Sequence, residues 1–169
     1  SSAASDVYKR QLLADTKKLA VELTREELDG LSEAQIEAYQ DGERFVVPIE
    51  LPTTQSLQAE LENSGARHKL FDASRARGRD TNADIVAESV KLRLERAKLL
   101  GFDSHADYVI AEETAGNAAA ARQLIADLAP AAAANAEAER KLASELAGED
   151  LDGADWPYWQ AKRREQELG

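Results

Sequence analysis

Two histidines, His68 and His105, are the side chains best suited to hold a metal ion or to transfer protons near neutral pH. A helical zinc site of the H-E-x-x-H type needs two histidines one turn apart, so that both rings reach one ion. His68 is followed by Lys-Leu-Phe-Asp and His105 by Ala-Asp-Tyr-Val, so neither has a second histidine at that spacing. We interpret both as ordinary surface or half-buried histidines.

Other catalytic patterns are absent from the sequence, which contains no G-x-S-x-G, no P-loop and no G-x-G-x-x-G. With 32 Asp and Glu residues, carboxylate pairs such as Asp103/Asp107 and Glu112/Glu113 are expected on solvated helix faces. The run D-T-N-A-D at 80–84 starts like a calcium loop but lacks the required Gly and the terminal Glu, which favours a helix cap. The residues themselves therefore indicate no catalytic, cofactor-binding or metal-binding side chain.

The composition is that of one acidic, helix-rich domain. The chain has 169 residues, of which 43% are hydrophobic and only 5% aromatic, and Ala and Leu supply most of the apolar side chains. The net charge of −11 argues against nucleic acids and anionic membranes as partners. There is no Cys, which excludes disulfides and thiolate metal sites. No apolar run approaches the roughly 20 residues of a membrane helix. We expect a cytoplasmic protein, with the periplasm left open.

Two segments near the N-terminus alternate apolar and polar residues, which predicts two short strands at 19–23 and 45–51. Pro48 cannot donate a hydrogen bond to a neighbouring strand, so we expect the second strand at a sheet edge or locally irregular. The predicted fold class is mainly α, with this short two-stranded β element near the N-terminus.

Capping residues and apolar spacing predict helices over the rest of the chain. The first three run from Ser32 toward Tyr39, ending at Asp41-Gly42, from a cap at Thr54, and from Ala66 to near Gly78. The next two are capped by Thr81 or Asn82, with an end at Leu100, and by Ser104. The last two run from Asn117 to about Ala147, where Pro130 should kink or split the helix, and from Trp156 onward.

Helix 84–100 carries apolar side chains around most of its circumference, and its acidic residues and lysines share one sector of roughly 80°. We therefore expect it to be the most buried helix of the chain. Arg93 and Arg96 fall inside the apolar arc, so at least one of them should hold a buried polar contact, because an unpaired buried guanidinium is costly. For Arg96 the alternative is that its long stem reaches water.

Several short segments resemble a known family in their order and spacing. They are L-F-D-A-S-R-A-R at 70–77, A-K-L-L-G-F at 97–102, S-H-A-D-Y at 104–108 and D-W-P-Y-W at 155–159. In this order they resemble the thimet-oligopeptidase family of zinc metallopeptidases, particularly its peptidyl-dipeptidase branch. The resemblance covers roughly residues 19–168. Trp159 departs from the second Tyr of the common D-W-x-Y-Y form, although Trp can fill an aromatic position.

This resemblance implies that residues 11–169 are the helical part of a larger peptidase, N-terminal to its catalytic zinc core, with residues 1–10 as a leader outside the core. Such a segment would form part of the wall of a channel in which short peptides are hydrolysed. In the family, zinc is held by the two His of H-E-x-x-H and a later Glu, and none of these is present here. We expect this chain alone to bind no zinc and to be inactive. Its expected partners are the remainder of the catalytic domain and, through the full-length protein, short peptides.

The sequence leaves a second class of function open. A stand-alone acidic helical module for binding or scaffolding would also lack catalytic motifs. An H-E-x-x-H motif in the reading frame beyond Gly169 would support the peptidase, and a stop codon there would support the module.

Overall fold

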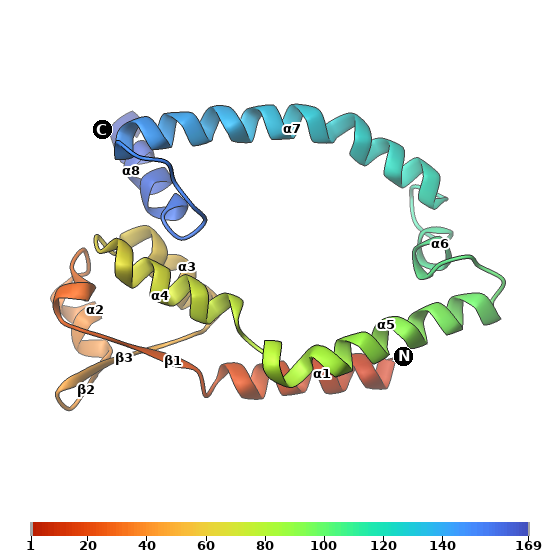
Figure 1. Cartoon of the computed structure of the whole chain (residues 1–169), viewed down its shortest axis with the longest axis horizontal. Helices are drawn as coiled ribbons and strands as arrows, with labels where there is room; N and C mark the ends of the chain where they lie inside the picture. Colours follow the sequence, from red (N-terminus) through yellow and green to blue (C-terminus); the bar gives the residue numbers. More distant parts are fainter. Residues whose placement is uncertain (1, 169) are drawn as a thin grey trace. The chain divides into compact units, whose positions relative to one another are not determined.

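The computed structural model describes the backbone of residues 2–168, and the side chains of that range except those of residues 2–5 and 8. Within this range the chain forms eight α-helices, one 3-10 helix and three short strands (Figure 1). It divides into two compact units, one of residues 12–80 and 139–168 and the other of residues 2–11 and 81–138. Each unit is described by itself.

A three-stranded antiparallel sheet belongs to the first unit. Its strands β1 (Ala20–Leu23), β2 (Gln40–Asp41) and β3 (Arg44–Pro48) lie in the order β1-β3-β2. The two predicted strands are thus confirmed as β1 and β3, and β2 is additional. The expectation that the second strand lies at an edge is wrong, because β3 is central. Pro48 is tolerated there because β2 pairs only with the first two residues of β3, so the last residue of β3 has no neighbour on that side.

The helices of the first unit that surround this sheet or extend from it are η1 (Glu26–Leu28), α2 (Glu33–Ala38), α3 (Leu51–Glu60), α4 (Ser64–Arg75) and α8 (Trp156–Leu168). α4 contacts β1, and α8 packs on α3. The capping box that predicts α2 is confirmed, because the side chains of Ser32 and Gln35 each accept from the other residue's backbone N–H. Asp41-Gly42 does not end this helix but lies in the hairpin between β2 and β3.

The predicted cap of α3, Thr54, is wrong by four residues, because the N-cap position is occupied by Glu50. The helix begins at Leu51, with Pro52 in its first turn, where a missing N–H costs nothing. Thr54 is instead buried inside the helix, and its hydroxyl donates to the carbonyl of Glu50 at 3.0 Å. The next helix, α4, is capped by Asn63, whose side-chain oxygen accepts from the N–H of Ala66 at 3.0 Å.

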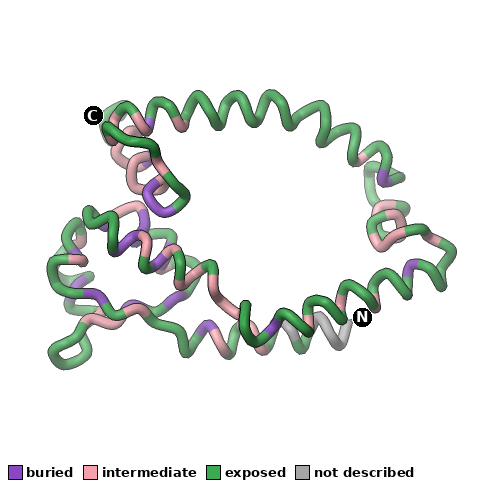
Figure 2. The backbone as a smooth tube through the Cα atoms, in the orientation of Figure 1, coloured by how far each residue is buried: buried purple, intermediate pink, exposed green. Residues whose placement is uncertain are grey.

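The hydrophobic core lies within this first unit, and Figure 2 shows that its buried positions gather on the sheet and the helices around it. Side chains from β1, η1, α2, β3, α3 and α4 form it: Leu23, Leu28, Ile36, Val47, Ile49, Leu57, Leu61, Ala66 and Leu70. Gly30 allows the turn after η1 to approach the end of α3. Its φ is +103°, and a Cβ at this position would lie 2.3 Å from the carbonyl oxygen of Glu60.

The remaining helices are α1 (Ser2–Thr16), α5 (Arg79–Leu99), α6 (His105–Ile110) and α7 (Ala118–Ala147). The cap of α6 by Ser104 is confirmed, because its hydroxyl accepts from the N–H of Asp107 at 3.1 Å. α7 runs unbroken past Pro130, so the predicted split is wrong. α5 begins at Arg79, so the predicted caps Thr81 and Asn82 lie inside its first turns. α1 crosses residue 10, and the assignment of residues 1–10 as a leader stays a prediction.

The prediction that helix 84–100 is the most buried helix is wrong. Val90 is 59% exposed and Leu99 is 88% exposed, and only Asn82 and Ala97 of α5 are buried. Arg93 and Arg96 are both exposed, so the expectation of a buried arginine in the apolar arc is wrong. The exposure of Arg96 matches the alternative of a long stem that reaches water, and its guanidinium lies 4.6 Å from the ring centroid of Tyr108. An apolar circumference of this kind normally packs against neighbours on most sides.

α7 shows the same exposure in Figure 2. Three leucines of its predicted apolar face are more than half exposed, namely Leu124, Leu128 and Leu142. Across the described residues, no helix combines the length and the apolar character needed to cross a membrane.

Candidate functional site

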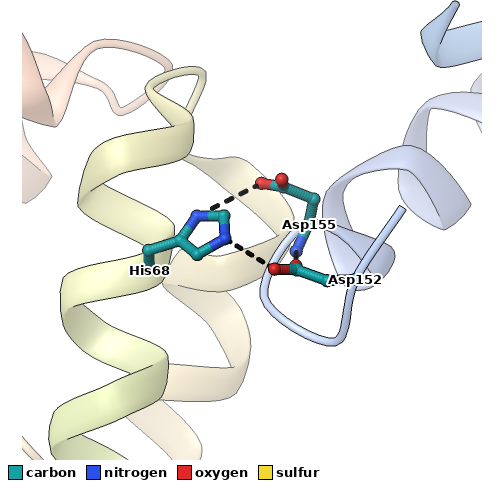
Figure 3. Close-up of side chains that lie close together, drawn as sticks. All are labelled: His68, Asp152 and Asp155. Carbon is teal, nitrogen blue, oxygen red and sulfur yellow. Dashed lines mark hydrogen bonds and ion pairs between the residues drawn. The ribbon is translucent and has the colours of Figure 1, made fainter. Parts of the chain in front are cut away.

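A group of interacting polar side chains joins α4 to the start of α8. Ser64, Arg67 and His68 lie on the first turns of α4, and Asp152 and Asp155 lie in the loop that leads into α8. We call these five residues the α4–α8 polar cluster. Figure 3 shows the imidazole of His68 between the carboxylates of Asp152 and Asp155. All five belong to the first unit, although the two segments are far apart in the sequence.

A buried ion pair forms the centre of this cluster. Arg67 is only 3% exposed, and its Nε donates to Oδ1 of Asp155 at 2.7 Å while one terminal nitrogen lies 2.6 Å from the same oxygen. Its other terminal nitrogen donates to the carbonyls of Leu61 and Glu62, at 2.8 and 2.9 Å. The hydroxyl of Ser64 donates to Asp155 at 2.9 Å. The buried guanidinium is therefore paired and hydrogen-bonded, which a buried charge requires.

The aspartates also organise the beginning of α8. Oδ1 of Asp152 accepts from the N–H groups of Ala154 and Asp155, at 2.9 and 3.2 Å. The N–H groups at this helix end have no partners inside the helix, so a carboxylate there stabilises it. The ring of Tyr158 lies one turn further along α8, with its centroid 4.4 Å from Cζ of Arg67. One arginine thus contacts both the carboxylate and the tyrosine ring of the D-W-P-Y-W segment.

His68 extends the cluster toward solvent with two hydrogen bonds. Its Nδ1 lies 2.8 Å from the carbonyl oxygen of Ser64, and its Nε2 lies 2.7 Å from Oδ2 of Asp152. Both partners only accept when Asp152 is ionised, so this geometry calls for a proton on each ring nitrogen, which is the imidazolium form. In agreement, the hydrogen bonds to the Ser64 carbonyl and to Asp152 raise the pKa of His68 above its ordinary value. The hydrogen bond from His68 lowers the pKa of Asp152 in turn.

The side chains of His68, Asp152 and Asp155 lie close enough for a metal ion, since one donor atom of each falls within 4.8 Å of the others. Their chemistry does not fit one. A histidine ligates a metal through an unprotonated nitrogen, and here both nitrogens face acceptors. The nearer oxygen of Asp155 already binds the Arg67 guanidinium, whose charge repels a cation. The arrangement therefore suits a structural link between α4 and α8 better than a metal site.

The sequence gives no reason to distinguish His68 from His105, but in the structure the two rings have different surroundings. His105 begins α6, and its ring centroid lies 6.3 Å from that of Tyr108. The carboxylates of Asp103/Asp107 and Glu112/Glu113 are not brought into the α4–α8 polar cluster. Sequence reasoning missed the pairing of Arg67 with Asp155. The available signal was Arg67 itself, which lies between the apolar residues Ala66 and Leu70 on the buried face of α4.

Comparison with known proteins places residues 57–169, which include the whole cluster, within a match to the model of Peptidase family M3. The dipeptidyl carboxypeptidase of Escherichia coli (strain K12) is 30% identical over 67% of this chain and 18% of that protein. The dipeptidyl carboxypeptidase of Salmonella typhimurium is 29% identical over 98% of this chain and 27% of that protein. Oligopeptidase A of Salmonella typhimurium is 26% identical over 79% of this chain and 22% of that protein. The chain thus spans between 18% and 27% of the length of these relatives.

Proposed function

This chain belongs to peptidase family M3. We propose that it is the helical part of a zinc-dependent oligopeptidase, and that this part precedes the catalytic core and helps to form the wall of the substrate channel. The observation that carries the proposal is the family match over residues 57–169. The names of the relatives, dipeptidyl carboxypeptidase and oligopeptidase, support short peptides as the substrates of the whole protein. Zinc is then held by residues outside this chain, because the one cluster of suitable donors among the described residues does not fit it.

Within such an enzyme, the first unit supplies a rigid element. The sheet-centred core fixes α3 and α4, and the Arg67–Asp155 pair fixes α8 to them. None of these contacts requires a group that reacts with a peptide bond. The role we propose for this unit is therefore to shape and support the channel, while the reacting groups come from elsewhere in the protein.

The exposed apolar faces of α5 and α7 support a place inside a larger domain. Val86, Val90 and Leu94 follow one another at intervals of four residues and are each at least 44% exposed. Stripes of this kind are normally covered by a neighbouring helix or sheet. The remainder of the peptidase, which makes up most of the relatives' length, is the covering element that we propose.

The first test of the proposal concerns activity. The reading frame that encodes this chain should also encode H-E-x-x-H after residue 169, and its product should cleave short peptides and lose this activity on chelation. Residues 1–169 alone should cleave none of these peptides and should retain no zinc after dialysis. A stop codon directly after Gly169 would instead favour a stand-alone helical module, and chelator-sensitive hydrolysis by residues 1–169 would refute the division of roles.

The second test concerns packing and uses the absence of Cys from this chain. Single replacements Val90→Cys and Leu128→Cys should react quickly with a thiol reagent in the 169-residue chain and at least about tenfold more slowly in the whole protein, where burial limits access. Glu88→Cys, in the polar sector of α5, is the matched control and should react at similar rates in both. Equal reactivity of Val90→Cys in both proteins would contradict the proposed packing.

A further inference from the structure

The two hydrogen bonds of His68 cannot both survive the loss of a proton. A neutral imidazole has a single N–H, so it can donate either to the Ser64 carbonyl or to Asp152, and the other nitrogen then faces an acceptor across 2.7 or 2.8 Å. The same Asp152 carboxylate caps the first N–H groups of α8 through its other oxygen. The protonation state of one ring is therefore coupled to the loop at 148–155 and to the beginning of α8.

We propose that His68 is a pH-sensitive clasp, which in its imidazolium form binds Asp152 and holds the 148–155 loop and the first turn of α8 against α4, and which loosens when it is deprotonated. This inference is independent of the peptidase assignment, because it rests on the described contacts of five residues alone. The buried Arg67–Asp155 pair joins α4 to the start of α8 without using His68, so it keeps α8 attached while the loop opens.

The charged groups around His68 favour its protonated form. Asp152 faces it from the loop, and Asp155 faces it from the start of α8, with Oδ1 4.0 Å from Nδ1. On its own helix, Arg67 is bound to Asp155, Lys69 is paired with Glu27 at 2.6 Å, and Asp72 is exposed one turn further on. Because Arg67 balances Asp155, Asp152 provides the nearest unbalanced charge, and it is negative.

The direction of the pH dependence follows from these contacts. The pKa of His68 is raised above 6.5, so its contribution is fully present below about pH 6.5 and is lost as the pH rises through the folded-state pKa. The pKa of Asp152 is lowered below 3.8, so its contribution is present above about pH 3.8 and is lost only as the pH falls through that lower value. The clasp is thus closed below about pH 6.5 and opens as the pH rises through the folded-state pKa of His68.

Nuclear magnetic resonance of the full chain tests the clasp directly, because only two histidines contribute ring signals. His68 should titrate above the ordinary pKa, and Asp152→Asn should bring its titration back toward that value. Asn keeps an oxygen that accepts from the N–H groups of Ala154 and Asp155, so this variant removes the charge without removing the cap. His105→Gln identifies the second ring signal and should leave the titration of His68 unchanged.

Amide hydrogen exchange then measures the opening of the 148–155 loop and the first turn of α8. After correction for intrinsic exchange, the protection of the Ala154 and Asp155 amides should fall about three- to tenfold as the pH rises through the His68 titration, which is the effect of losing one hydrogen bond. In His68→Gln the protection should not change over this range. The proposal would be overturned by a His68 that titrates at or below the ordinary value, by constant protection of these amides in the unmodified chain, or by an equal fall in His68→Gln.

Discussion

Replacing Asp155 by Leu should lower the free energy of unfolding of the first unit by a large fraction. Arg67 is 3% exposed, and Asp155 is the carboxylate that pairs with it, at 2.6 and 2.7 Å. Without it, a guanidinium remains buried with two backbone carbonyls as acceptors. Removing one partner of a buried pair in this way costs about 3–5 kcal/mol, out of the roughly 5–15 kcal/mol that stabilises a typical domain.

Urea unfolding followed by circular dichroism measures this effect. With a slope of about 2 kcal/mol/M, a loss of 3–5 kcal/mol lowers the midpoint by about 1.5–2.5 M. Asp150→Asn is the matched control, since Asp150 also pairs with an arginine, Arg140, at 2.7 Å but has an 89% exposed side chain. An exposed pair contributes about 0–1 kcal/mol, so the control midpoint should shift by less than about 0.5 M.

A double replacement separates the charge effect from packing. Arg67→Met together with Asp155→Leu removes both charges, so this variant should be at least about 2 kcal/mol more stable than Asp155→Leu alone. If Asp155→Leu does not fold, Ser64→Ala removes one hydrogen bond to the same carboxylate and should cost about 1 kcal/mol. The reasoning would be refuted if Asp155→Leu and Asp150→Asn shifted the midpoint equally, or if the double variant were less stable than both single ones.

Two further predictions concern the fold. Gly30→Ala should destabilise the chain by about 3 kcal/mol in urea unfolding, because the new Cβ meets the Glu60 carbonyl at 2.3 Å and the φ of +103° is strained for Ala. Gly42→Ala, also at positive φ but in open space, should cost only about 1 kcal/mol, and equal losses would contradict the close approach. The 169-residue chain should also bind a hydrophobic dye and self-associate through α5 and α7, and the double variant Val90→Ser/Leu94→Ser should weaken both effects in fluorescence and light scattering. A monomeric chain that binds no dye would count against uncovered apolar faces.

Local features of the structure could be predicted from the sequence because they depend on residues close together in the chain. The capping box at Ser32 and Gln35, the Ser104 cap and the alternation in β1 and β3 all have their causes within a few residues. The family could also be identified, because it depends on the order of short segments along the chain, and the match over residues 57–169 confirms it.

The tertiary structure alone decided which apolar faces are covered. β3 is central because β1 pairs with one of its sides and β2 with the other, which no property of the 45–51 segment foretells. The apolar circumference of α5 was correctly recognised, but periodicity shows only that a face needs a partner and not whether this chain contains it.

The α4–α8 polar cluster likewise required the three-dimensional structure. One hydrogen-bond partner of His68, the Ser64 carbonyl, is four residues away. Its carboxylate partners lie more than eighty residues away, in a loop that looks like a solvated acidic turn. Its protonation follows from two acceptors placed on opposite sides of one ring. The sequence determines which side chains can carry a charge. Folding determines which of them lie close enough together, and are shielded enough from water, for the charges to affect pKa values and stability.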